Sequence, residues 1–128
     1  MRLLLDTHAL LWWLNDDRLL PAKARKLIAL GSNAVVVSAA SAWEIATKVR
    51  LGKLDMAADL AADFSNVLSQ EGFESLPISV DHALRAALLP GPHKDPFDRM
   101  LIAQAQAEGV PIVSSDTVFD SYGVRRLW

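Results

Sequence analysis

Leu3-Leu4-Leu5-Asp6 is a short apolar run that stops at an acid. The same pattern returns at 34–38 (Ala-Val-Val-Val-Ser) and at 110–114 (Val-Pro-Ile-Val-Ser), where a small polar residue ends the run. Continuous apolar runs of this length are typical of strands that are buried on both faces of a parallel sheet. We therefore predict strands at 2–5, 34–38 and 110–114.

Helical periodicity fills the segments between these strands. Apolar positions that recur every three to four residues predict helices at 21–30, 41–50, 57–70, 80–88 and 97–108. Pro21 suits a helix start and Gly109 suits a helix end. Two further short strands are expected at 75–78 and 124–127. Because strands alternate with helices, the expected class is α/β.

Length and composition narrow the class of protein. The 128 residues suit one domain, so a single domain over 1–128 is expected, and 52% hydrophobic with 22% charged residues favours an ordered globular chain. The absence of Cys excludes a disulfide, a thiolate zinc site and a Cys nucleophile. With a formal net charge of -2, a nucleic-acid substrate would have to meet a local basic patch.

No segment predicts contact with a membrane. The longest uninterrupted apolar run, 9–14, is far shorter than the roughly 20 residues that a membrane-spanning helix needs. No export signal is visible. A soluble protein of the bacterial or archaeal cytoplasm is the expectation.

Four acids occupy positions that an α/β architecture brings to one edge of the sheet. Asp6 and Asp116 each follow a predicted strand, and Glu44 and Asp98 lie in the first turns of predicted helices. Ligands of such sheets bind in the crevice outside the carboxyl ends of the strands. We therefore expect the four carboxylates to point to that edge.

A cluster of carboxylates favours a divalent cation. Like charges that lie close together raise the pKa of one another unless a cation neutralises them. Oxygen ligands without Cys suit Mg²⁺ or Mn²⁺ better than zinc. Such a cation can activate a water for attack on a phosphodiester.

The same acids also have structural interpretations. Ser41-Ala42-Trp43-Glu44 matches a helix capping box, and Asp95-Pro96-Phe97-Asp98 resembles one with Asp95 as the cap. The other two acids could cap a helix or stand in a turn. On the residues alone, three functions stay open: a metal-dependent nuclease, a non-catalytic interaction module whose acids cap helices, and a metallophosphoesterase that acts on small substrates.

The residues around the acids resemble the motifs of PIN domains. Leu3-Leu4-Leu5-Asp6-Thr7-His8 resembles their opening strand and acid, and Ser38-Ala39-Ala40-Ser41-Ala42-Trp43-Glu44-Ile45 resembles their second acidic motif. Residues 93–105 are similar to the third motif, and Val113-Ser114-Ser115-Asp116 is similar to the fourth. The motifs occur in order over 3–119, and the run from Asp95 to Ala105 resembles the VapC-like bacterial branch.

This resemblance implies a fold, an activity and partners. The fold would be a three-layer α/β/α domain with a mainly parallel sheet. The protein would be the ribonuclease toxin of a VapBC-type toxin-antitoxin pair, cutting single-stranded or tRNA-like RNA with Mg²⁺ or Mn²⁺. Its partners would be a cognate antitoxin and a second copy of the chain, in a homodimer. Asp6, Glu44, Asp98 and Asp116 carry over as the catalytic, metal-site acids, with Asp116 as a helper.

Further residues have possible supporting roles. Ser115 could orient a water or a phosphate, and Asp95 could be a helix cap, which we prefer, or an outer-shell acid. Lys48 and Arg99, with Lys53 close by, could contact RNA phosphates beside the acids. Their simpler interpretation is that solvated cations are common and favour helix C-termini.

Two more residues beside the acids have competing interpretations. Trp43 could stack on an unpaired base, although packing against protein is the preferred interpretation. His8 would be a metal ligand in a binuclear metallophosphoesterase, whose later Gly-Asp and Asn-His motifs this sequence lacks. We expect His8 to be a hydrogen-bonded residue at a helix start.

Overall fold

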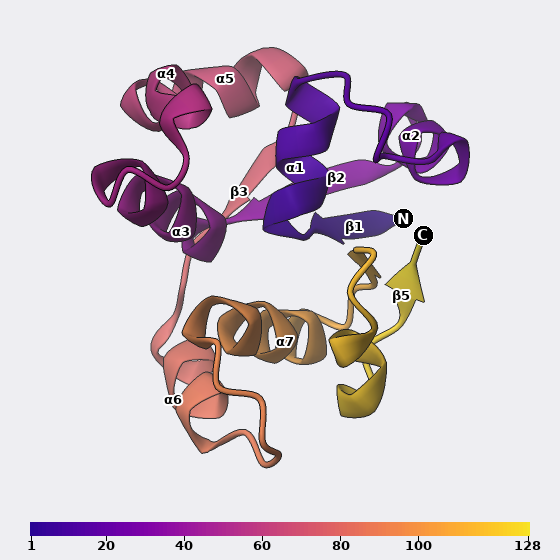
Figure 1. The fold of residues 1–128 in the computed structure, drawn as a ribbon. Helices are drawn as coiled ribbons and strands as arrows, with labels where there is room; N and C mark the ends of the chain where they lie inside the picture. The colour runs from indigo at the N-terminus through magenta and orange to yellow at the C-terminus, as the bar shows by residue number, and fades with distance from the viewer.

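A five-stranded parallel sheet forms the centre of the computed structural model, which describes residues 1–128 (Figure 1). In sheet order its strands are β3 (Glu74–Leu76), β2 (Ala34–Ser38), β1 (Arg2–Leu5), β4 (Ile112–Val113) and β5 (Arg126–Leu127). Every neighbouring pair is parallel. The central position of β1 explains its sequence, because its three leucines are fully buried.

Helices cover both faces of this sheet. They are α1 (Thr7–Leu14), α2 (Ala22–Ala29), α3 (Ala39–Arg50), α4 (Ala58–Ala62), α5 (Phe64–Glu71), α6 (Val80–Leu88) and α7 (Pro96–Glu108), with short 3-10 turns η1 (Asp55–Ala57) and η2 (Thr117–Tyr122). Figure 1 shows α1, α2, α4 and α5 on one side of the sheet and α6 and α7 on the other. The predicted three-layer α/β/α architecture is confirmed.

Alternate residues of β1 pack into two separate hydrophobic cores, one on each face of the sheet. Leu3 and Leu5 pack with α1, α2 and α5, and Leu4 packs with the buried residues Leu101 and Ile102 of α7. This alternation follows from strand geometry, in which successive side chains point to opposite faces. The core residues of both layers therefore hold β1, and the acid after it, in a fixed place.

The middle of the chain differs from the prediction of one helix over 57–70. The structure has η1, α4 and α5 there, because Asp63 leaves the helical conformation with φ -139° and ψ 35°. Asp has low helix propensity, so a break at this residue costs little. The apolar residues Leu60 and Phe64 still pack against the core, so the predicted face is kept while the helix is not.

The predicted limits of the short strands were too generous. The strand predicted at 110–114 pairs only over 112–113, and that predicted at 124–127 pairs only over 126–127. Proline next to a strand has no N–H to donate to the ladder, which limits β4 after Pro111 and β3 before Pro77. None of the helices combines the length and apolar character needed to span a bilayer.

Candidate active site

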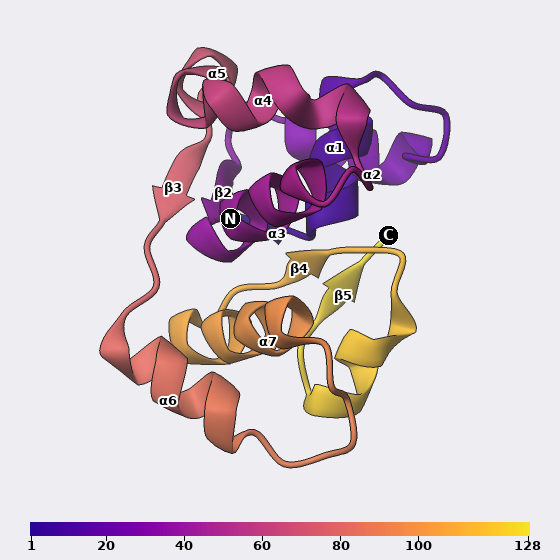
Figure 2. The same ribbon diagram turned by 60° about the vertical axis from the view of Figure 1, so that its left-hand side comes forward.

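The central strand β1 and its neighbour β2 lead to the first two acids at one edge of the sheet. Asp6 directly follows β1, and Glu44 lies in α3, which begins directly after β2. Asp98 comes from the first turn of α7. Figure 2 shows α3 lying alongside α7. Charge coupling links the three carboxylates, because Glu44 raises the pKa of Asp6 and Asp6 raises the pKa of Asp98.

Asp6 is a buried carboxylate with one strong donor. It is 6% exposed, and its Oδ2 accepts a hydrogen bond of 2.6 Å from Ser114 Oγ. It stands at the N-cap position of α1, but its side chain makes no capping bond, so the capping interpretation is wrong for this residue. Burial raises the pKa of Asp6, and the Ser114 hydrogen bond partly offsets that rise.

Glu44 is buried as deeply as Asp6 and forms an ion pair with a lysine. It is 5% exposed, and its Oε2 lies 2.6 Å from Lys48 Nζ, one helical turn further on. The capping-box interpretation of 41–44 is wrong, because α3 already begins at Ala39 and Ser38 caps it by accepting from the Ala40 N–H. Ser41 instead bonds the Thr7 hydroxyl at 2.9 Å, which ties the start of α3 to the start of α1.

Asp98 is the second acid of the site whose pKa is raised. Its pKa is raised to about 6, mainly by burial and further by the charges of Asp95 and Asp6. His93 Nε2 lies 3.0 Å from Asp98 Oδ2 and acts in the opposite direction. Asp95 is the N-cap of α7, accepting from the Phe97 and Asp98 N–H groups, as the capping interpretation predicted.

Asp116 differs from this trio in its exposure and its bonding. Its side chain is exposed and caps η2 by accepting from the Val118 N–H at 3.0 Å. It is not among the charges that shift the pKa of Asp6 or Asp98. Ser115 is exposed, and the hydroxyl that reaches Asp6 belongs to its buried neighbour Ser114, which also accepts from the Asp116 N–H.

Sequence reasoning missed the roles of Ser114 and His93. Ser114 ends the strand predicted at 110–114. Its position, where that strand passes into a loop beside β1, was a signal that could have placed its hydroxyl near Asp6. His93 stood inside the third motif, five residues before Asp98, without a role assigned to it. Both residues hydrogen-bond an acid that the sequence did single out.

The donor set suits a hard divalent cation by its chemistry. Asp6, Glu44 and Asp98 offer only oxygen, and their mutual repulsion is the kind that a cation relieves. The arrangement is not a preformed cage, because no group of three or more His, Asp or Glu side chains lies close enough to hold an ion. Each carboxylate instead has its own partner: Ser114, Lys48 or His93.

The sequence matches the model of the PIN domain over residues 3–124. The chain belongs to the PIN domain family. Among curated proteins, the comparison finds no match.

Solved structures place the same fold in toxin-antitoxin proteins. The PIN domain superposes on VapBC2 from Rickettsia felis, bound to a promoter DNA fragment, with a TM-score of 0.73, 17% identity and coverage of 99% of this chain and 98% of that one. VapC20 of Mycobacterium tuberculosis, a toxin that cleaves the sarcin-ricin loop, superposes with a TM-score of 0.70 at 17% identity, and the match covers 95% of both chains. For a toxin-antitoxin complex from Klebsiella pneumoniae the TM-score is 0.58 at 22% identity, and the match covers 90% of this chain and 87% of that one.

Arg99 of this PIN domain has a structural task. Its guanidinium donates to the carbonyl oxygens of Ala86, Leu89 and His93, with a longer bond to that of Ala87. It therefore joins the end of α6 and the following loop to α7. These bonds occupy the guanidinium of Arg99. We therefore assign Arg99 to holding α6 against α7, in place of the predicted contact with an RNA phosphate.

An aromatic pair bridges the two helices that carry Glu44 and Asp98. Trp43 and Phe97 meet edge to face with ring centroids 4.8 Å apart, although Trp43 stays 55% exposed. Each aromatic residue is the sequence neighbour of an acid. The pair therefore fixes the spacing of α3 and α7 next to the site, in agreement with the packing interpretation of Trp43.

Proposed function

We propose that this PIN domain is a metal-dependent endoribonuclease, the toxin of a VapBC-type pair, and that Asp6, Glu44 and Asp98 hold its Mg²⁺ or Mn²⁺. The observation that carries the proposal is that β1, α3 and α7 bring Asp6, Glu44 and Asp98 to one edge of the sheet, where Asp6 and Glu44 are buried, within a chain that matches the PIN domain. VapC20, which shares the fold, is a toxin that cleaves the sarcin-ricin loop, and this supports RNA as the substrate class.

The chain's own residues would prepare the site for the reaction. A bound divalent cation would supply a water of lowered pKa and neutralise charge on the phosphodiester. Ser114 holds the Asp6 carboxylate in place, and the Thr7 and Ser41 hydroxyls fix α1 against α3. Asp116, whose N–H donates to Ser114, would act as a helper by keeping Ser114 in position.

Cleavage of defined RNAs tests this function. Purified protein is incubated with single-stranded and tRNA-like RNA in Mg²⁺ or Mn²⁺, and then in EDTA. We expect cation-dependent cleavage that is lost in Asp6→Asn and kept in Asp55→Asn, which changes an exposed acid outside the trio. Equal cleavage by the wild type and Asp6→Asn would assign the activity to another site or to a contaminant.

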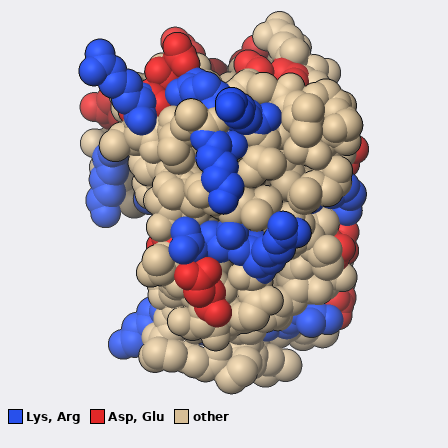
Figure 3. Space-filling model, turned by 90° about the vertical axis from the view of Figure 1, so that its right-hand side faces the viewer, with Lys and Arg blue, Asp and Glu red and all other residues tan.

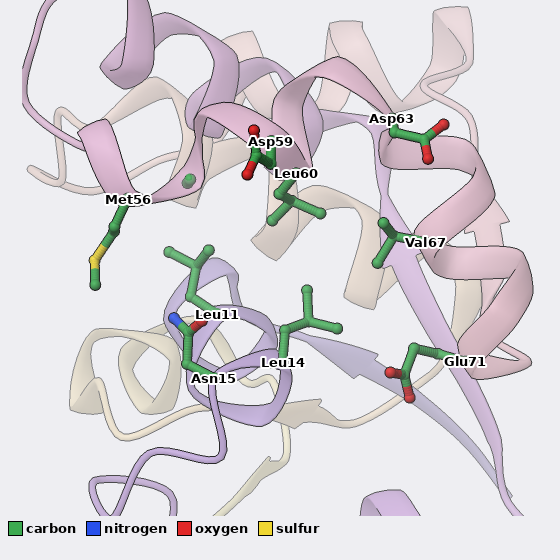
Figure 4. A pocket seen from close by; sticks show the side chains of 10 residues that line it. Leu11, Leu14, Asn15, Met56, Asp59, Leu60, Asp63, Val67 and Glu71 are labelled. Carbon is green, nitrogen blue, oxygen red and sulfur yellow. The ribbon is translucent and has the colours of Figure 1, made fainter.

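A groove between α1 and the α4–α5 segment suits the cognate antitoxin (Figure 4). The groove has a volume of about 470 Å³, and its floor includes Leu11, Leu14 and Val67. Its rim carries three acids, Asp59, Asp63 and Glu71. An antitoxin segment with apolar side chains flanked by Lys or Arg would complement this surface, and the complexes formed by the structural neighbours support such a partner.

Co-expression with a short reading frame found beside this gene, followed by co-purification, tests this partner. Val67→Arg should abolish the complex, because it puts a cation and excess volume into the groove. The matched change Val80→Arg, at a 78% exposed position of α6, should leave the complex intact. Equal binding by both variants would place the antitoxin elsewhere. The predicted homodimer is tested separately by analytical ultracentrifugation of the isolated chain.

One observation favours a non-catalytic interaction module as a second candidate. Each acid of the trio already has a partner within the chain, so the carboxylates are satisfied without an ion. A module of this kind would show no change in melting temperature with Mn²⁺, whereas a cation-binding site raises it by linkage.

A further inference from the structure

A small basic cavity adjoins the acid trio on its α1–α3 side. It has a volume of about 230 Å³ and lies between the start of α1, the inner face of α3 and the loop after α3. Its lining residues are Thr7, His8, Leu11, Ile45, Lys48, Lys53 and Leu54. Three of these residues carry basic side chains and none is acidic.

The cavity is contiguous with the proposed active site. Thr7 and His8 directly follow Asp6, and the charge of His8 lowers the pKa of Asp6, so the imidazole lies within electrostatic reach of that carboxylate. Lys48 lines the cavity and contacts Glu44 Oε2 at 2.6 Å. A ligand in the cavity would therefore lie next to the residues that we propose to cut RNA.

The positive charge of the cavity is not used up by acids of the chain. Lys48 is neutralised by Glu44, but Lys53 is exposed and takes part in none of the ion pairs. His8 is also exposed, with its ring near that of Trp12. Lys53 and His8 are therefore free to meet an anion, in a chain whose formal net charge is -2.

We propose that this cavity binds a backbone phosphate of the RNA, adjacent to the phosphate that is cut. This proposal rests on the proposed ribonuclease function. The volume of the cavity is below the roughly 300–1,000 Å³ of pockets that hold whole drug-sized ligands. A cavity of this size suits one phosphate group with part of its sugar. A polyanion that approaches three carboxylates needs cations beside them, and Lys53 supplies one.

A second basic surface provides the control. Figure 3 shows Lys and Arg side chains gathered on the face seen from the right of Figure 1, on the side of α2 and the two termini. The carboxyl end of β1 points away from that side (Figure 1). Lys26 of α2 is exposed and forms no ion pair, as is true of Lys53. The two lysines thus differ in their distance from the proposed subsite rather than in exposure.

Binding of a fluorescein-labelled single-stranded RNA, measured by anisotropy in EDTA at 50 and 200 mM salt, tests the subsite. Loss of one phosphate contact lowers the salt slope for a single strand by about 0.7, so the affinity ratio of wild type to Lys53→Gln should fall about 2.6-fold over this fourfold range of salt. Lys26→Gln should bind as the wild type does. Both variants should keep the wild-type melting temperature, since each lysine is exposed and unpaired.

The outcomes separate the subsite from the ribonuclease function. Wild-type affinity and slope in Lys53→Gln, an equal loss in Lys26→Gln, or no RNA binding by the wild type would each overturn the subsite. If the wild type cleaves RNA while Lys53→Gln binds normally, the subsite alone fails. If the wild type binds RNA through Lys53 but cuts none with any cation, the proposed function fails, and only the contact of Lys53 with an RNA phosphate stands.

Discussion

Replacing Asp98 by Asn should stabilise the protein in the absence of a cation. The pKa of Asp98 rises from 3.8 to about 6, a difference of about two units. At 1.36 kcal/mol per unit, keeping this carboxylate ionised costs up to about 3 kcal/mol of the free energy of unfolding at pH 7.5. Asn removes that cost but weakens the contact with His93, so a net gain of about 1–2 kcal/mol is expected.

The pH dependence fixes the sign of this effect. A carboxyl group with a raised pKa in the folded protein binds its proton more tightly there than in the unfolded chain. Its contribution therefore destabilises the fold as the pH rises from about 4 to about 6, and it is constant above that window. The advantage of Asp98→Asn should be present at pH 7.5 and nearly absent at pH 4.

Melting curves followed by circular dichroism measure the stability of the wild type and of Asp98→Asn, once in EDTA and once in excess Mn²⁺. A cation at 100 times its Kd would stabilise the wild type by about 2.7 kcal/mol, and Asp98→Asn should lose most of this gain. Asp55→Asn is the control and should follow the wild type throughout. The reasoning is refuted if Asp98→Asn is less stable than the wild type in EDTA at pH 7.5, or if the two proteins gain equally from Mn²⁺.

Three further changes probe the structure around the site. Ser114→Ala should raise the pKa of Asp6, because it removes a hydrogen bond that lowers it, and the acid limb of the pH-rate profile should move to higher pH. Arg99→Gln should lower the free energy of unfolding in urea by about 2–4 kcal/mol, since carbonyl groups at the end of α6 lose their donors. Leu101→Ala, at a fully buried position, should cost about 2–5 kcal/mol in the same assay. Unchanged values would contradict the assigned contacts.

The strands, and the place of the first three acids at one edge of the sheet, could be predicted because they depend on local signals. The leucines of β1 and the valines of β2 are continuous apolar runs, and such runs need burial on both faces. The acid that follows β1 must then lie at the carboxyl edge of the sheet. The same logic placed Glu44, although its helix starts earlier than predicted.

The remainder depends on contacts between distant segments. The break at Asp63 lies inside an unbroken apolar pattern, so periodicity could not reveal it. The choice of Ser114 over Ser115 depends on which hydroxyl faces Asp6, 108 residues away in the chain. Arg99 resembled a free cation in the sequence, and only the position of α6 against α7 shows that backbone carbonyl groups surround it.

The central claim is that Asp6, Glu44 and Asp98 hold the catalytic cation, and anomalous diffraction from crystals grown with Mn²⁺ tests it most directly. The account predicts a manganese peak in contact with carboxylate oxygens of these three residues, with Lys48 displaced from Glu44 or sharing it. A peak at another place in the molecule, or no peak under conditions in which Mn²⁺ supports RNA cleavage, would contradict it.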